Sequence, residues 1–302
     1  EIVVDHGSMV VADGCRGLGQ SVAHQAMSVA IERVREHGLV LLGLRNAHHI
    51  GRVGHWAEMA IGAGLVSVHF VSAFTPPRVA PHAGRDARFA TNPFTVGIPR
   101  RGRPPLLLDW ATSAIAQGKV RIAYNSGRPV PAGALLDAEG RPRVDPAVMF
   151  EPPLGALLPM AGHKGFGLAI VNELLSAALL GGEPLHDLRP LPRHAIWNNM
   201  LAIVLDPARL GDLDAFEREA AAYEDWVRSS RIAEGFDAIR MPGEPEREAR
   251  SARAAGIAID ARTMAQLDWA ADAVDRALPL LSGLAQRARP APGAAEGRGS
   301  GT

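Results

Sequence analysis

The chain has 302 residues, of which 47% are hydrophobic and 21% charged, so it is long enough to bury a large core and has the composition of a globular protein. Its 32 basic and 32 acidic residues balance, which gives no electrostatic support for nucleic-acid binding. Cys15 is the only cysteine, so an intrachain disulfide is excluded, and no apolar run reaches the roughly 20 residues of a membrane span. We therefore expect a cytoplasmic protein without a membrane or nucleic-acid partner.

Apolar patterning predicts helices and strands that alternate through most of the chain. Short apolar runs bounded by turn residues predict strands within 1–17 and over 39–44, 65–71, 94–98, 105–108 and 200–205. Apolar residues at the helical period predict helices over 21–36, 56–63, 114–124, 168–180, 214–228 and 257–277, and another after the turn at 241–246. The strands at 94–98 and 105–108 are expected to form a hairpin with a basic tip at 100–103. We expect one domain over 1–286 and a disordered tail over 287–302, which is rich in small residues, Pro and Gly.

The segment from Arg45 to His55 is the strongest candidate for a site of chemistry. It joins a predicted buried strand to a predicted helix and carries three imidazoles, arginine and two glycines. Histidines at such a junction also serve as caps and surface groups, so both interpretations stay open. A metal site made by His48, His49 and His55 is disfavoured, because adjacent side chains on an extended segment point to opposite faces. His69, in the next predicted strand, is expected to be a core residue.

Three further segments combine polar residues with predicted turns. The segment over 75–93 is rich in Pro and Gly and is predicted to be a long ordered loop, because Asn92 and Pro93 at its end favour order. Loops of this length are usually functional or disordered. Asp109, Thr112 and Ser113 follow a predicted strand, where they could cap the next helix or hold a ribose or phosphate. Lys164 lies in a glycine-rich stretch, 162–167, before a predicted helix whose first amides and dipole would favour an anion. The spacing of a Walker loop and the Gly-x-Gly-x-x-Gly fingerprint are both absent, so a conventional Rossmann site is poorly supported.

Six motifs follow one another along the chain: Arg45 to Gly51, Thr91 to Pro93, Leu108 to Ser113, Gly118 with Lys119, Asp145 with Pro146, and Gly162 to Gly165. Their order resembles that of the malate/L-lactate dehydrogenase family, which is separate from the classical Rossmann dehydrogenases and includes ureidoglycolate and sulfolactate dehydrogenases. The resemblance covers roughly residues 10 to 285. Details such as His48 to Arg52 and Met241 to Glu244 are closest to the bacterial hydroxycarboxylate dehydrogenase B branch.

The resemblance implies an oxidoreductase that transfers a hydride between NAD or NADP, with NAD slightly favoured, and a 2-hydroxy or 2-oxo carboxylic acid. It implies an α/β fold around a largely antiparallel sheet with flanking helices, a small acid as substrate, a homodimer and no metal. His49 would be the acid/base group, with His48 beside it, because imidazole exchanges a proton near neutral pH. Arg52 or Lys164 could hold a substrate carboxylate or a cofactor phosphate. The residues expected at the cofactor are Gly51, Arg52, Val53, Thr91, Asn92, Leu107, Leu108, Asp109, Trp110, Ala111, Thr112, His163, Lys164, Asn198, Gly243, Glu244, Pro245 and Glu246.

Two departures from the family pattern accompany this resemblance. Ala47 stands where many members have Ser, so a hydroxyl contact is lost there. Members also begin with a helical segment that carries a Ser-His-Gly motif, and Glu1 aligns after that segment, so we expect a fragment or a truncated chain. The alternative function is therefore a catalytically impaired family member that folds and binds nucleotide without turnover.

Overall fold

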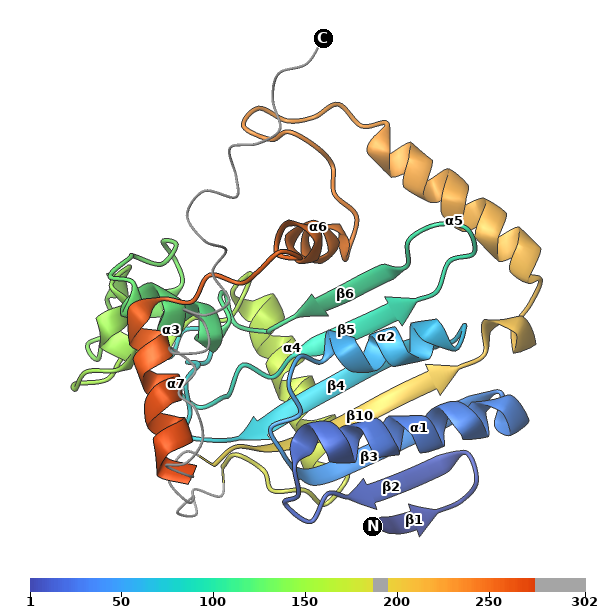
Figure 1. The fold of residues 1–302 in the computed structure, drawn as a ribbon, viewed down its shortest axis with the longest axis horizontal. Coiled ribbons are helices and arrows are strands. Elements are labelled where there is room, and N and C mark those ends of the chain that lie inside the picture. The colour runs from blue at the N-terminus through green and yellow to red at the C-terminus, as the bar shows by residue number, and fades with distance from the viewer. Residues whose placement is uncertain (187–194, 275–302) are drawn as a thin grey trace, which may run out of the picture.

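A seven-stranded sheet forms the centre of the molecule (Figure 1), a computed structural model that describes residues 1–186 and 195–274. The strand order is β1-β2-β3-β10-β4-β5-β6, and every neighbouring pair is antiparallel except β2 and β3. The expectation of an α/β fold around a largely antiparallel sheet is confirmed. The strands are β1 (Ile2–Asp5), β2 (Met9–Asp13), β3 (Leu39–His48), β4 (Val66–Phe74), β5 (Phe94–Ile98), β6 (Leu106–Trp110) and β10 (Trp197–Leu205).

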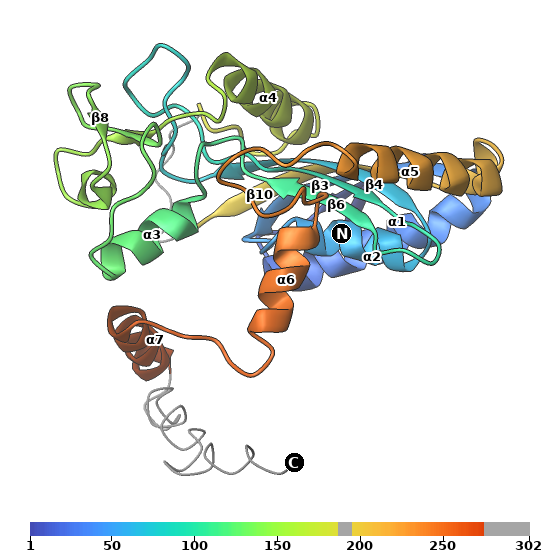
Figure 2. The same cartoon turned by 90° about the horizontal axis from the view of Figure 1, so that it is seen from above.

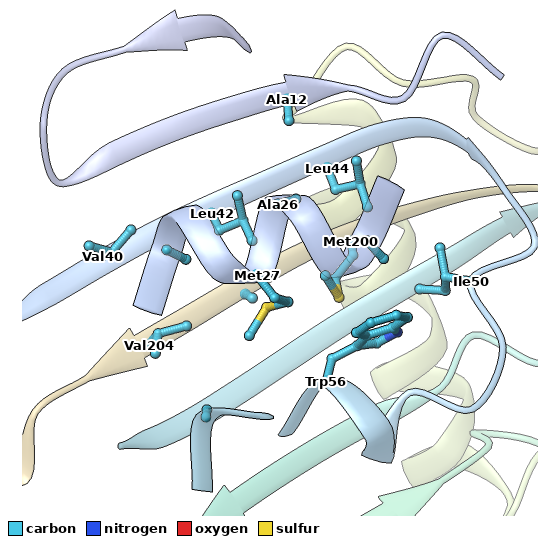
Figure 3. Packing of buried hydrophobic residues seen from close by; sticks show 14 of the residues in the cluster. Ala12, Ala26, Met27, Val40, Leu42, Leu44, Ile50, Trp56, Met200 and Val204 are labelled. Carbon is cyan, nitrogen blue, oxygen red and sulfur yellow. The ribbon is translucent and has the colours of Figure 1, made fainter. Parts of the chain in front are cut away.

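Helices cover both faces of this sheet (Figure 2). One face carries α1 (Gly19–His37) and α2 (Gly54–Gly62), and the other carries α4 (His163–Glu173) with the π-helical turn η2 (Leu174–Ala178). The main core fills the space beneath α1 and α2. There, Met27 and Trp56 pack against Leu42, Leu44 and Met200 from the sheet (Figure 3), and each of the five is at most 2% exposed. This burial fixes the positions of the strand ends where the polar segments lie.

A smaller lobe lies beyond the ends of β3 and β4. It contains a second sheet in the order β8-β7-β9, with β7 (Leu135–Leu136), β8 (Pro142–Arg143) and β9 (Ala156–Leu157). Around it pack α3 (Gln117–Asn125) and the 3-10 turn η1 (Pro146–Met149), whose first turn is capped by the Asp145 side chain. The loop over 75–93 joins the two sheets through backbone bonds, for example from Ala80 N–H to Leu157 O. It is therefore an ordered wall and not a free loop.

The C-terminal part of the described chain first runs along the outside of the main sheet and ends beside the small lobe, where Asn125 of α3 donates to Thr263 Oγ1 at 3.0 Å (Figure 2). It holds the 3-10 turn η3 (Pro207–Arg209), then α5 (Leu213–Arg228), α6 (Glu244–Ala252) and α7 (Ala261–Val274). The tip of the β5–β6 hairpin docks on α5, since the buried Arg100 side chain lies 3.3 Å from Glu217 and 3.2 Å from Glu224. Arg101 and Arg103 pair with Asp214 and Asp225. The basic tip predicted at 100–103 is thus an interaction surface for α5.

Most predicted elements are confirmed, with two corrections. β3 does not end at Leu44 but continues to His48, so the histidines follow a longer strand. α4 begins at His163 and not at Leu168, with Gly162 at its N-cap, so Lys164 lies in the first helical turn instead of a preceding loop. The predicted tail over 287–302, the domain boundary at 286 and the end of the last predicted helix lie outside the described residues. Among the helices that the structure describes, none is long and apolar enough to cross a membrane.

Candidate active site

The end of β3 is shaped by two neighbouring asparagines of β10. Asn199 Oδ1 accepts a hydrogen bond of 2.9 Å from Asn46 N–H, and the register between β3 and β10 shifts between Asn198 and Met200. Asn46 has a φ of +54°, which is uncommon for a residue other than glycine. The strand is therefore irregular at the point where the two histidines follow.

The turn after β3 is held by Asn198 and anchored in the core by Ile50 and Val53. Asn198 Oδ1 accepts from Ile50 N–H at 3.0 Å, and Asn198 Nδ2 donates to Ser72 O at 3.0 Å. Ile50 is 1% and Val53 4% exposed. Both hydrogen-bonding groups of the Asn198 amide are thus engaged by the framework, so Asn198 positions the turn and also contributes to the wall of the adjoining pocket.

The two histidines of the turn have different roles in the structure. His48 Nδ1 accepts from His49 N–H at 2.9 Å, and its ring meets Trp197 edge to face. His49 Nδ1 accepts from Gly51 N–H at 3.0 Å, so a neutral His49 ring carries its hydrogen on Nε2. The His49 side chain is exposed in part and buried in part. Its partial burial is the main cause that lowers the pKa of His49 below the usual 6.5, and the nearby His48 lowers it further.

His49 and Gly51 line a pocket of about 420 Å³ between the main sheet and the small lobe. Thr91 and Asn198 also contribute to it, as the sequence analysis expects for the site. From the small lobe come Arg78, Gln117 and Arg121, which that analysis did not single out as site residues. The rest of the wall is mainly apolar and includes Ile50, Val53, Val71, Ala73, Ala90, Pro93 and Ile196. A mainly apolar pocket with a few polar groups is the usual form of a small-molecule site.

A second and larger pocket, of about 970 Å³, lies on the other side of the same turn. Its walls come from α1, α2 and α6, and Ile50 and Gly51 line both pockets. On its α2 side, Glu58 pairs with Arg52 at 2.5 Å and with Arg250 at 3.0 Å. The turn from His49 to Val53 therefore lies between two adjacent cavities and contributes residues to both.

Asp109, expected at the cofactor or at a helix cap, is bound by groups of the framework. Its Oδ2 accepts from Gly54 N–H at 2.9 Å, and its Oδ1 accepts from Thr95 Oγ1 at 2.8 Å. Arg52 Nη1 lies 3.5 Å away. Of the two roles left open for Asp109, the structure does not show a cap on the helix after its own strand: Asp109 binds the first amide of α2, and the N-terminus of α3 has no side-chain cap.

Several other predicted cofactor residues also belong to this framework. Asn92 is fully buried, and its Nδ2 donates to Ala169 O and Glu173 Oε2, each at 3.1 Å. Thr112 is 1% exposed and donates through Oγ1 to Thr91 O at 3.1 Å. Neither side chain lines the two pockets.

The remaining predicted cofactor residues lie along β6, at the start of α6 and at the start of α4. Leu107 N–H donates to Pro242 O, which places the turn at Gly243 beside β6, and Glu244 pairs with Arg228 at 2.5 Å. His163 and Lys164 are exposed, with the His163 ring 6.0 Å from that of His82. None of these predicted cofactor residues lines either pocket. They are Leu107, Leu108, Trp110, Ala111, His163, Lys164, Gly243, Glu244, Pro245 and Glu246.

His69 lies apart from the turn, whereas His55 borders it, since His55 N–H donates to Arg52 O at 3.1 Å and His55 lines the larger pocket. His55 belongs to α2, and His69 is a fully buried core residue as predicted, with Nε2 2.9 Å from Ser67 Oγ. Within the described ranges 1–186 and 195–274, no group of three His, Cys, Asp or Glu residues could hold a metal ion.

Arg78, Gln117 and Arg121 are the pocket residues that sequence reasoning missed. Arg121 lies four positions after Gln117 and three after Gly118 on α3, so it shares a helical face with each of them. That spacing was visible, but which face of α3 meets the histidine turn depends on the packing of two distant segments.

The fold is a mixed α/β fold around a mainly antiparallel sheet, and the histidine turn borders a pocket of the usual small-molecule form. The chain belongs to the malate/L-lactate dehydrogenase family, whose model matches residues 1–268. It is 47% identical over 262 residues to hydroxycarboxylate dehydrogenase B of Escherichia coli, covering 86% of this chain and 72% of that protein. It is 40% identical to an L-lactate dehydrogenase of Cupriavidus necator, covering 92% and 80%. The solved sulfolactate dehydrogenase of Methanocaldococcus jannaschii superposes with a TM-score of 0.78 at 31% identity, covering 91% and 78% of the two chains.

The two adjacent pockets meet at Gly51, where the backbone is open to a ligand. Gly51 lines both pockets and has a φ of +77°, a conformation that side chains other than glycine rarely adopt. Only Gln20 atoms, at 3.7 Å, would meet a Cβ there. A ligand can thus approach the backbone at the point where the two cavities meet.

Proposed function

We propose that the chain is a nicotinamide-dependent dehydrogenase that interconverts 2-hydroxy and 2-oxo carboxylic acids. The observation that carries this proposal is the pocket of about 420 Å³ in which His49 faces polar groups of the small lobe across a mainly apolar wall. The names of the relatives, which act as hydroxycarboxylate, lactate and sulfolactate dehydrogenases, support the reaction class.

In this proposal, the turn from Gly51 to Val53 holds the dinucleotide, and a bound nicotinamide supplies or accepts the hydride. NAD is favoured over NADP, because the basic tip residues Arg100, Arg101 and Arg103 are already paired with acids of α5. They are therefore not free to receive a 2′-phosphate. A cytoplasmic location remains a prediction from the sequence.

His49 is proposed to handle the proton at the substrate C2 oxygen. In the arrangement of the structure, its Nε2–H is a hydrogen-bond donor to an oxygen that gains negative charge. To deliver the proton itself, the ring must be an imidazolium, in which Nδ1 also carries hydrogen and gives up the bond from Gly51 N–H. That contact favours the neutral ring, as do burial and His48, which lower the pKa of His49.

Turnover is measured by nicotinamide absorbance with a panel of 2-oxo acids and both dinucleotides. The His49→Ala variant is expected to lose activity by about 10²- to 10⁴-fold while it still binds dinucleotide, since only the acid/base group is removed. His6→Ala, an exposed histidine outside both pockets, is the matched control. Full activity of His49→Ala would exclude the acid/base assignment, and dinucleotide binding without turnover by the unchanged chain would favour the non-catalytic alternative.

The pH dependence tests the same assignment. Oxidation of a hydroxy acid needs a neutral His49 that can accept a proton at Nε2, so Nδ1 must carry the ring hydrogen and give up the bond from Gly51 N–H. A lowered pKa keeps the ring neutral to lower pH. The acid limb of kcat/KM for oxidation is therefore expected below the ordinary histidine pKa of 6.5. An acid limb above that value would contradict the assignment.

A further inference from the structure

Two arginines of the small lobe, Arg78 and Arg121, line the same pocket as His49. Arg78 belongs to the loop wall, where its N–H donates to Phe89 O at 2.7 Å and its O accepts from Leu157 N–H at 2.8 Å. Arg121 projects from α3, and its guanidinium carbon lies 4.0 Å from the centre of the Phe150 ring. The backbone of Arg78 and the guanidinium of Arg121 are thus both held in place.

Neither guanidinium has a carboxylate within ion-pair distance among the described residues. This distinguishes them from Arg52, Arg100 and Arg228, each of which is paired with Glu. Burial, and next the charge of Arg121, lowers the pKa of Arg78, so the two cations are close enough to repel each other. An anion in the pocket would relieve this repulsion.

A third polar group lies at the same end of the pocket. Gln117, the first residue of α3, has a buried Oε1 without a hydrogen-bond partner among the residues that the structure describes. An unpaired buried polar atom costs free energy unless a ligand or water satisfies it. The part of the pocket wall that comes from the small lobe therefore carries two cations and a free amide oxygen, in the same pocket that His49 lines.

We infer that Arg78 and Arg121 form a carboxylate-binding site for the substrate, with the Gln117 amide beside it. Guanidinium groups match carboxylates in shape and charge, and hydrogen bonds between ions are stronger than neutral ones. A pocket of about 420 Å³ suits a small acid better than a whole dinucleotide. This inference rests on the proposed function, because it assigns the recognition of that function's substrate.

The test uses oxalate, a small dicarboxylate that needs no turnover, in calorimetric titrations of the purified chain. Arg78→Gln is expected to weaken oxalate binding by about 10- to 100-fold, and Arg78→Lys less, since Lys keeps the charge but not the planar fork. Arg128→Gln is the matched control, because Arg128 lines a different cavity and bonds Ser126. Unchanged binding by Arg78→Gln would overturn the inference.

Steady-state kinetics then separate the substrate from the cofactor. With Arg78→Gln, the KM of a 2-oxo acid should rise by about 10-fold or more while the KM of the dinucleotide stays unchanged. If the KM rises for both pyruvate and oxaloacetate, the site binds the carboxylate that all 2-oxo acids share. If the KM rises for oxaloacetate alone, the site binds the second carboxylate. Both results support the site. A rise confined to the dinucleotide KM would overturn it.

These outcomes distinguish the site from the proposed function. Oxalate binding that depends on Arg78, in a chain that turns over no 2-oxo acid, would leave the anion site standing and reject the dehydrogenase. If the chain turns over 2-oxo acids and Arg78→Gln does not change that turnover, the dehydrogenase stands and the anion site is rejected. Arg121→Gln serves as a second variant, with thermal unfolding as the control for lost stacking on Phe150.

Discussion

Three histidines show how strongly the surroundings of a residue set its chemistry. His49 lies on the pocket wall, where its Nδ1 is occupied by Gly51 N–H and its Nε2 stays available. His55 lies on α2, 4.0 Å from Glu58. His69 is fully buried in β4 with Ser67 as its hydrogen-bond partner. Of the three, only His49 lines the pocket of about 420 Å³ and keeps a ring nitrogen available there, which is why it carries the proposed proton transfer.

His69 is expected to make the protein sensitive to acid. Burial lowers the pKa of His69 to about 3, whereas the unfolded chain protonates this ring near 6.5. The unfolded state therefore binds more protons below pH 6.5, and the stability from His69 is lost as the pH falls from about 6.5 toward 3. Between pH 7.5 and 5 the loss from this one group is about 2 kcal/mol.

Urea unfolding at the two pH values measures this loss, and the His69→Met variant isolates it. The variant lacks the buried imidazole, so its free energy of unfolding should fall less than that of the unchanged chain on acidification. The exposed histidines contribute equally to both proteins and cancel. The same decrease in both proteins would mean that His69 is not the group responsible.

At the scale of elements, the histidine turn depends on its close contact with α1. A Cβ on Gly19 would lie 2.1 Å from His48 O and 2.3 Å from His49 O, so no larger residue fits unless the turn moves. The turn is also held from the opposite strand by Asn198. The placement of His49 is therefore set by two segments that are far apart in the sequence.

Gly19→Ala should displace the turn and reduce activity without touching any reacting group. We expect a loss of about 10-fold or more in kcat/KM, because small shifts of catalytic groups are costly, and a loss of stability of about 1–3 kcal/mol from overpacking. Gly62→Ala on α2 is the control, since no atom lies within 4 Å of its added Cβ. It should gain up to about 1 kcal/mol of stability and keep its activity. Equal activity of the two variants would refute the role of the contact.

The local pattern of apolar residues and turn residues predicted most helices and strands. The features that it missed depend on contacts between segments far apart in the sequence. The β5–β6 hairpin follows from two apolar runs joined by a short basic turn, and it is confirmed. The start of α4 was misplaced because glycine disfavours helices, yet Gly165 N–H and Phe166 N–H close its first turn on Met160 O and Gly162 O. The candidate turn was visible as a cluster of histidines, but Arg78 and Arg121 enter the same pocket only through the docking of the small lobe.

At the scale of the whole molecule, the C-terminal helices expose an apolar surface. α5 contains no buried residue, although its sequence is amphipathic. Its acidic side chains Glu217 and Glu224 face Arg100. Tyr223 and Trp226 are 64% and 69% exposed, with ring centres 5.8 Å apart. One side of α5 thus binds the sheet, and another presents aromatic rings to solvent.

We predict that a second copy of the chain covers these rings in a homodimer, since adjacent exposed aromatic residues are typical of interfaces. Light scattering after size exclusion should give twice the chain mass of 32.0 kDa. Trp226→Glu combined with Tyr223→Glu should shift the protein to the monomer, because a buried interface does not tolerate unpaired charges.

Leu210→Glu is the control, because Leu210 is an exposed apolar residue at the end of the η3 turn, outside α5. A monomeric unchanged chain at all concentrations, or equal dissociation by the control, would contradict an α5 interface. If the double variant is monomeric and still folded, its activity shows whether the pocket is complete within one chain.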